Sequence, residues 1–210
     1  MADNYIDLQA EIAGYLGRSD LEEQIMLFIR LAEARMNREL RLKLMERQAY
    51  ADLRPGEAAI PLPDKHIPGD WDVFLEMRDL RLNGGLLKNL EYISLDTLPE
   101  PQAVGQPVAY SILGRELVMT PSPDAAYRLF LTYYAEIPPL GGAQPSNDIL
   151  LRSPDLYLYG ALTASAAYTR SSIPLDLWEQ EYLKAAKGLA ESDNHGRFTA
   201  NIALRPIRSV

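Results

Sequence analysis

Hydrophobic residues recur at helical spacing in the first part of the chain. From Tyr5 to Leu16 they return every three or four positions, and Gly14 and Gly17 mark the end of the segment. A second, longer stripe consists of Leu21, Ile25, Phe28, Ile29, Ala32, Met36 and Leu40. The opposite side of that segment carries Glu22, Glu23, Arg30, Glu33, Arg35 and Arg38. The pattern predicts two helices, the second amphipathic and about five turns long, with Ser19 and Glu22 as a capping box.

The hydrophobic period changes to a strand-like alternation after the second helix. Turn sequences such as Pro55-Gly56 and Asn83-Gly84-Gly85 separate the alternating stretches. The expected strands are 48–53, a short return strand at 58–62, then 74–82, 90–93, 109–113, 116–120 and 127–134. The prolines between positions 61 and 71 predict a loop. Residues 46–146 are therefore expected to form an inserted antiparallel β domain with loops.

The helical period returns after a loop rich in proline and glycine. The segment from Pro154 to Tyr168 is apolar on nearly all sides, which is typical of a buried helix. A further helix is expected after Pro174, with a stripe made of Trp178, Tyr182, Ala185, Ala186 and Leu189. Residues 191–210 show no sustained period, which predicts an extended arm. The fold class is therefore α+β: segments 1–45 and 147–190 form a helical bundle, with the β domain inserted at 46–146 and an extended C-terminal arm at 191–210.

The amino-acid composition disfavours some classes of function and excludes others. The chain has 210 residues, 47% of them hydrophobic, and a formal net charge of −8 from 21 basic and 29 acidic residues. A protein that grips nucleic acid by its phosphates usually carries a basic surface, so this balance argues against a DNA-binding module but not against a protein that surrounds DNA. The absence of cysteine excludes disulfides and thiolate chemistry. No signal peptide and no membrane span are expected, and the chain is expected to fold in a cytoplasm.

The sequence offers little catalytic chemistry. The two histidines, His66 and His195, lack metal-ligand spacing, and no nucleotide-binding glycine motif or nucleophile elbow is present. Asp64, Asp70 and Asp72 lie close together in sequence, but their spacing matches no calcium-binding loop. We therefore assign no catalytic, cofactor-binding or metal-ligating residue. Acidic residues that are distant in sequence can still form a hydrolase site, so this alternative stays open.

Aromatic residues gather in the last expected strand and the helix after it, which suggests two interpretations. The cluster comprises Tyr127, Phe130, Tyr133, Tyr134, Tyr157 and Tyr159. Stacking on nucleic-acid bases would require interleaved basic residues, and only Arg128 is present. Alternation of core and surface positions along a strand is the favoured interpretation.

Six segments, taken in their order along the chain, resemble the head-to-tail adaptor proteins of tailed bacteriophages, also called connector, gatekeeper or tail tubular A-like proteins. The segments are 28–40, 74–78, 92–94, 109–112, 131–140 and 154–162. The resemblance spans residues 5 to 190, and it rests on the ordered series, because no single motif is diagnostic.

This resemblance implies a non-enzymatic virion protein of the neck. It implies a dodecameric ring under the portal protein, which extends the channel through which genomic DNA passes and offers a platform for tail or nozzle proteins. The C-terminal arm is then the candidate portal-docking element, through Arg197, Phe198, Arg205 and Arg208. Independently of the resemblance, the mostly apolar helix suits either a core contact or a subunit contact, and as a subunit-packing helix it would act through Leu156, Tyr159 and Leu162. The alternatives are a head-completion or tail-terminator protein, and a virion-associated hydrolase.

Overall fold

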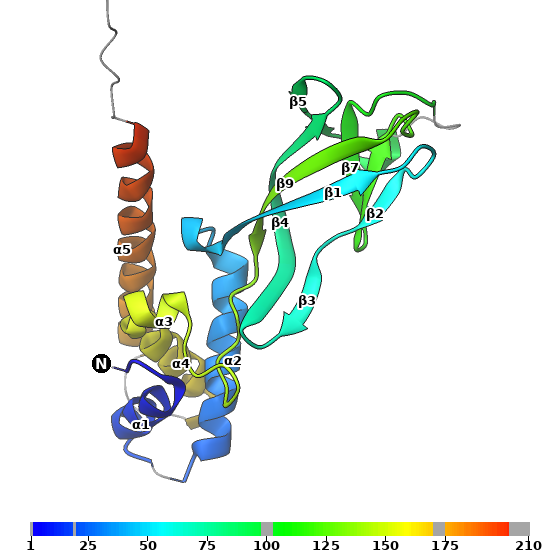
Figure 1. Cartoon of the computed structure of the whole chain (residues 1–210). Coiled ribbons are helices and arrows are strands. Elements are labelled where there is room, and N and C mark those ends of the chain that lie inside the picture. The colour runs from blue at the N-terminus through cyan, green and yellow to red at the C-terminus, as the bar shows by residue number, and fades with distance from the viewer. Residues whose placement is uncertain (1, 19, 98–102, 170–174, 202–210) are drawn as a thin grey trace, which may run out of the picture. The chain divides into compact units, whose positions relative to one another are not determined.

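The computed structural model describes residues 2–18, 20–97, 103–169 and 175–201 (Figure 1). The chain divides into two compact units. One unit combines Met1–Met45 with Ile137–Val210 and is helical, and the other comprises Glu46–Glu136 and is built from strands. The α+β class that the sequence predicts is confirmed.

The helical unit is organised around its fourth helix, which packs against the other four. Its elements are α1 (Tyr5–Leu16), α2 (Glu22–Glu39), the 3-10 turn η1 (Lys43–Met45), α3 (Asp148–Arg152), α4 (Pro154–Thr169) and α5 (Leu175–Asn201). Helix α4 contacts α1, α2, α3 and α5, so it is the central element of the unit (Figure 1). The short helix α3 was not predicted from the sequence.

Helix α1 has the bounds that the periodicity predicts. The side chain of Asn4 accepts hydrogen bonds from the backbone N–H groups of Ile6 and Asp7, both at 3.0 Å, and so caps the helix start. Gly17 adopts a left-handed φ of 62° and ends it. Leu8 and Ile12 are fully buried, as expected for the stripe.

Helix α2 buries its predicted stripe completely but begins later than predicted. All seven hydrophobic residues of that stripe are buried. The helix starts at Glu22, with Leu21 at the N-cap position and no capping hydrogen bond from a side chain, so the predicted capping box is wrong. The guanidinium of Arg18 holds Asp20 through two hydrogen bonds of 2.7 Å, which keeps that residue in the preceding turn. Ser19 lies outside the described residues.

A glycine on α4 allows this helix to approach α2 closely. A Cβ atom added at Gly160 would lie 3.0 Å from the Cβ of Ala32 and 3.4 Å from the ring of Tyr182. Nearby, the rings of Phe28 and Tyr168 meet edge to face at 5.8 Å. Gly160 therefore allows close packing between helices of the same chain.

An arginine on α2 fixes the start of α5. Arg35 donates to both carboxylate oxygens of Glu179 at 2.8 and 2.6 Å and to Glu39 at 2.9 Å. Its guanidinium also lies 3.9 Å from the centroid of the Tyr182 ring, and the Tyr182 hydroxyl donates to Glu39 at 2.9 Å. A bidentate pair of this kind is geometrically specific, so it sets the position of α5 along α2.

Helix α5 is longer than predicted, because residues 191–201 are helical where the sequence predicted an extended arm. Two contacts involve the first residues of this stretch. Lys187 and Glu191 form an ion pair one turn apart at 3.8 Å, and the carboxylate of Asp193 accepts a hydrogen bond from the backbone N–H of Lys43 in η1. Residues 202–210 lie outside the described residues.

The second unit contains two sheets. Its strands are β1 (Glu46–Leu53), β2 (Ala59–Pro61), β3 (Asp64–Ile67), β4 (Asp70–Asn83), β5 (Leu87–Asn89), β6 (Glu91–Tyr92), β7 (Ala109–Leu113), β8 (Glu116–Thr120) and β9 (Tyr127–Ala135), with a 3-10 turn η2 (Leu95–Thr97). One sheet has the order β1-β9-β4-β3, with β5 also on β4, and the other has the order β2-β8-β7-β6. Strands of both sheets contribute to one core, which includes Leu53, Ile60, Leu80, Leu117, Met119, Leu129 and Tyr133.

Three features of this unit differ from the prediction. Residues 64–67 form a strand on β4 and not a loop, because Pro63 and Pro68 flank the paired residues and leave their N–H groups free to bond. The segment at 58–62 does not return onto β1 but pairs with β8, opposite Leu117. Strand β6 pairs with β7 in parallel, so the unit is not purely antiparallel. Each difference concerns strands of two to four residues, whose partners are set by the core and not by a local turn.

The close approach at Gly160 gives a stability prediction. Gly160→Val should lower the free energy of unfolding by about 1–3 kcal/mol, because the added methyl groups would overlap Ala32 and the Tyr182 ring. Gly14→Ala is the control, since nothing lies within 4 Å of a Cβ there, and it should raise stability by about 0.5–1 kcal/mol. Urea denaturation measures both. Equal stability of Gly160→Val and the parent would show that α4 does not pack this closely.

Candidate functional site

The acidic residues that the sequence singled out lie on the β3–β4 hairpin, where basic groups engage two of them. Asp64 forms an ion pair with Arg115 and lies 2.6 Å from a ring nitrogen of His66, and Asp70 pairs with Lys65. The described residues contain no group of three histidine, cysteine, aspartate or glutamate side chains that could hold a metal ion. These acids therefore stabilise the hairpin.

The third acid, Asp72, binds a buried tyrosine. The hydroxyl of Tyr133 donates to both carboxylate oxygens of Asp72, at 2.8 and 2.7 Å. Burial, and then the Asp72 carboxylate, raise the pKa of Tyr133. Tyr134 and Tyr157 are buried as well, whereas Tyr127 is half-buried. The buried rings present no face on which a base could stack.

The predicted subunit-packing residues lie on α4. Leu156 and Leu162 have no exposed surface within the single chain, and Tyr159 is half-buried. The two leucines thus belong to the core of this chain, and of the three side chains only Tyr159 is left with surface for a second copy. The predicted docking residues Arg197 and Phe198 lie on the final turns of α5, where the structure describes the backbone alone, and Arg205 and Arg208 lie outside the described residues.

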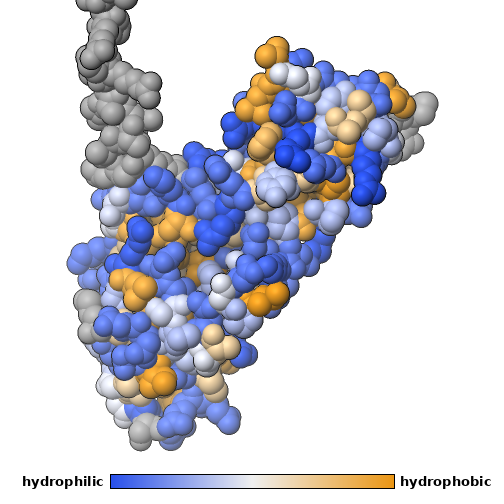
Figure 2. All heavy atoms as spheres, in the orientation of Figure 1, coloured by the Kyte–Doolittle hydropathy of each residue, from blue (hydrophilic) through white to orange (hydrophobic). Residues whose placement is uncertain are grey.

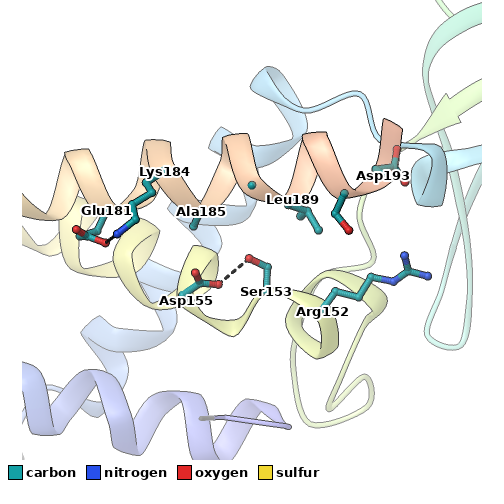
Figure 3. A pocket seen from close by; sticks show the side chains of 10 residues that line it. Arg152, Ser153, Asp155, Glu181, Lys184, Ala185, Leu189 and Asp193 are labelled. Atoms are coloured by element: carbon teal, nitrogen blue, oxygen red, sulfur yellow. Dashed lines mark hydrogen bonds and ion pairs between the residues drawn. The ribbon is translucent and has the colours of Figure 1, made fainter. Parts of the chain in front are cut away.

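A polar groove runs along α5 beside the junction of α3 and α4 (Figure 3). It has a volume of about 730 Å³ and is lined by Arg152, Ser153, Asp155, Glu181, Lys184, Ala185, Gly188, Leu189, Ser192 and Asp193. Figure 3 shows Arg152 and Asp193 at one end and Glu181 and Lys184 at the other. Charges of both signs thus face the groove, which suits a polar peptide segment better than a single small anion.

The contacts within this groove are structural. The hydroxyl of Ser153 donates to Asp155 at 2.6 Å, and Lys184 pairs with Glu181 at 3.3 Å. No histidine or cysteine is among the lining residues, so Ser153 has no neighbouring base of the kind that activates a serine nucleophile. The groove has the character of a binding surface and lacks a nucleophile–base pair.

The most deeply buried polar cluster of the helical unit holds the segment by which the chain returns from the strands. Glu33 on α2 is only 5% exposed and accepts hydrogen bonds from the backbone N–H of Leu140 at 2.7 Å and the Tyr157 hydroxyl at 3.3 Å. The side-chain amide of Asn147 donates to the Tyr157 hydroxyl at 2.7 Å and to the carbonyl of Pro138 at 2.8 Å. The cluster therefore joins α2, α4 and the return segment 137–147.

This glutamate was assigned to the polar side of α2 from the sequence, and its burial was missed. At helical spacing it lies one turn from both Ile29 and Met36, which are fully buried, so it borders the apolar stripe. Burial raises the pKa of Glu33 to about 7, against the opposing effects of the hydrogen bonds from Leu140 and Tyr157 and of the charge on Arg30. Its protonation state therefore changes near neutral pH.

The raised pKa of Glu33 predicts a loss of stability as the pH rises. Below the ordinary carboxyl pKa of 4.5 the group is neutral in both states, and between 4.5 and about 7 only the unfolded chain ionises. Since a tenfold change in proton affinity corresponds to roughly 1.4 kcal/mol, the free energy of unfolding should fall by about 3 kcal/mol from this group alone. Glu33→Gln keeps an acceptor for Leu140 and should remove this fall, as measured by urea denaturation at pH 4 and pH 8.

The matched control is Glu23→Gln on the exposed side of the same helix. It should leave the pH profile parallel to that of the parent chain. If the profile of Glu33→Gln were also parallel to that of the parent, the carboxyl group would not be held neutral in the folded state.

Comparison with known proteins gives one finding. A family model described as SU10 adaptor protein matches residues 3–205 and so covers both units of the chain. A search of curated proteins finds no match. Among the described helices, none combines the length and apolar character needed to cross a membrane. The match agrees with a chain whose polar clusters serve packing and binding. Because it covers far more than half of the residues, the chain belongs to the SU10 adaptor protein family, a family of phage head-to-tail adaptors.

Proposed function

We propose that this phage adaptor assembles with copies of itself into a dodecameric ring beneath the portal protein, where it extends the DNA channel and carries the tail or nozzle. The family match over residues 3–205 is the observation that carries the proposal, because it includes the helical unit and the strand unit together. Family membership makes the chain a structural component of the virion neck. Assembly takes place in the host cytoplasm.

The charge of the chain suits a channel through which DNA must move. With 29 acidic and 21 basic residues, each copy contributes a net charge of −8 to the ring. A channel with an excess of the same sign of charge as the phosphates offers few cations to replace the counterions of DNA, so in this proposal genomic DNA passes without specific binding.

The two units serve two partners in this proposal. The helical unit meets the portal protein through the C-terminal arm, which carries Arg197, Phe198, Arg205 and Arg208. The strand unit offers its surface to tail or nozzle proteins. The Arg35–Glu179 pair fixes the start of the long helix α5. This supports the role, because α5 then holds the arm at a defined position relative to the helical unit.

A non-enzymatic role agrees with the described side chains. The three acids that lie close together in the sequence all have partners: Asp64 and Asp70 pair with basic side chains, and Asp72 binds Tyr133. Ser153 in the groove hydrogen-bonds to a carboxylate alone. These contacts give the named polar residues a role in packing. A structural function is therefore the best-supported one.

Purified chain mixed with portal rings tests the proposal. Negative-stain microscopy and mass photometry should show a second ring of about twelve copies on the portal, whereas the chain alone should be monomeric or weakly associated. Absence of association with the portal would contradict the proposal and would favour a head-completion or tail-terminator role.

The arm gives a mutational prediction. Replacing Arg197, Arg205 and Arg208 by glutamine should weaken portal binding by about tenfold or more, because each charge-assisted hydrogen bond contributes roughly 1.5–3 kcal/mol. The matched control replaces three exposed cations elsewhere, Arg30, Arg38 and Arg54, by glutamine and should bind normally. Titration by mass photometry measures both variants. Normal binding by the arm variant would show that the arm does not dock.

A further inference from the structure

One edge of the larger sheet has no further strand paired with it among the described residues. Strand β1 pairs with β9 in an unbroken register from Glu46↔Tyr134 to Leu53↔Tyr127, and no strand in the described part of the chain pairs with its other side. The strand contains no proline, glycine or bulge of the kind that usually protects an edge. Its outer residues Gln48, Tyr50 and Asp52 are exposed.

The opposite edge of the same sheet lies at the same level along the strands. When the paired residues are followed across the sheet from β1 to β9, β4 and β5, Asp52 of β1 is level with Leu87 of β5. Tyr50 is in the same way level with Asn89. All three residues of β5 are exposed. A copy of the chain displaced only sideways would therefore bring its β5 beside β1 without a shift along the strand direction.

The strand directions also match. β1, β9, β4 and β5 alternate, since each neighbouring pair is antiparallel. β5 consequently runs opposite to β1, so a copy turned by a small angle about an axis along the strands would add to the sheet as an antiparallel strand. Antiparallel addition gives the stronger of the two hydrogen-bond patterns.

The side chains at the two edges are complementary. Tyr50 is 71% exposed and Leu87 is 52% exposed, and both lie on the same face of the sheet. Figure 2 shows apolar surface at the β5 end of this unit. In a level pairing, Tyr50 and Leu87 of adjacent copies are diagonal neighbours within reach of each other. On the other face, Ala51 would stand opposite Lys88 and leaves room for it.

We propose that β1 of one copy pairs with β5 of the next, Tyr50 opposite Asn89 and Asp52 opposite Leu87, so that the larger sheets join into a continuous belt. This seam rests on the proposed ring. The two edges differ in sequence and lie on opposite sides of the sheet, so each copy uses both, as a closed head-to-tail ring requires. A second copy is favoured over a strand from another protein because level and direction match within this one chain.

The absence of cysteine makes the test direct. Tyr50→Cys combined with Asn89→Cys should give, after oxidation of rings assembled on the portal, a ladder of covalent multimers on a non-reducing denaturing gel. Asp52→Cys with Leu87→Cys probes the same register with exposed residues and should behave alike. Chains that carry only one of the two cysteines should form dimers only when mixed with the complementary chain. Tyr50→Cys with Leu113→Cys, which is 54% exposed in the other sheet, is the control and should give no ladder.

The outcomes separate this seam from the ring itself. Rings that assemble on the portal but give no more cross-links than the control would overturn the seam and leave the proposed function standing. Self-linking of Tyr50→Cys alone would also overturn it, because β1 would then pair with β1. Failure of the parent chain to form any ring would contradict the proposed function, and the seam with it.

Discussion

The helical unit depends on how the chain is held where it returns from the strands. The unit is made of two segments that are separated by the whole of Glu46–Glu136. Glu33 accepts from the backbone of Leu140, and Asn37 on the same helix accepts from the backbone of Ile137 at 2.8 Å. Two side chains of α2 thus satisfy backbone groups that would otherwise be buried without partners. The arrangement sets where α3 and α4 begin.

The buried polar cluster around Glu33 costs stability, and the choice of side chains in it determines how large that cost is. Burying a carboxyl group is unfavourable unless it is hydrogen-bonded or neutral, and Glu33 is both hydrogen-bonded and raised in pKa to about 7. Apolar residues would fill the space but would leave the Leu140 N–H without an acceptor. The cluster therefore exchanges some stability for a defined path of the return segment. A defined path would suit the proposed ring, in which every copy repeats the same geometry.

Local patterns predicted much of this fold. Helices α1 and α2, the buried helix α4, the stripe of α5 and the β7–β8 hairpin follow from spacing and turn residues, because neighbours in sequence determine them. The burial of Glu33, the strand at 64–67 and the parallel pairing of β6 depend on contacts between distant residues, which a single sequence does not display. The Asp193–Lys43 contact near the start of the helical continuation joins residues far apart in the chain, so the sequence alone does not show it. For the candidate site, the family resemblance indicated the role, whereas Leu156 and Leu162 are taken up by the chain's own core.

The proposed ring combines these features in one assembly: a helical unit fixed by the Glu33 cluster, a net negative charge on each copy and sheet edges that are level and opposite in direction. Electron cryomicroscopy of the chain bound to its portal is the most direct measurement of this account. It should show a closed ring of about twelve copies coaxial with the portal, with the helical unit unchanged in each copy. A chain that binds the portal as isolated copies, or not at all, would contradict the account.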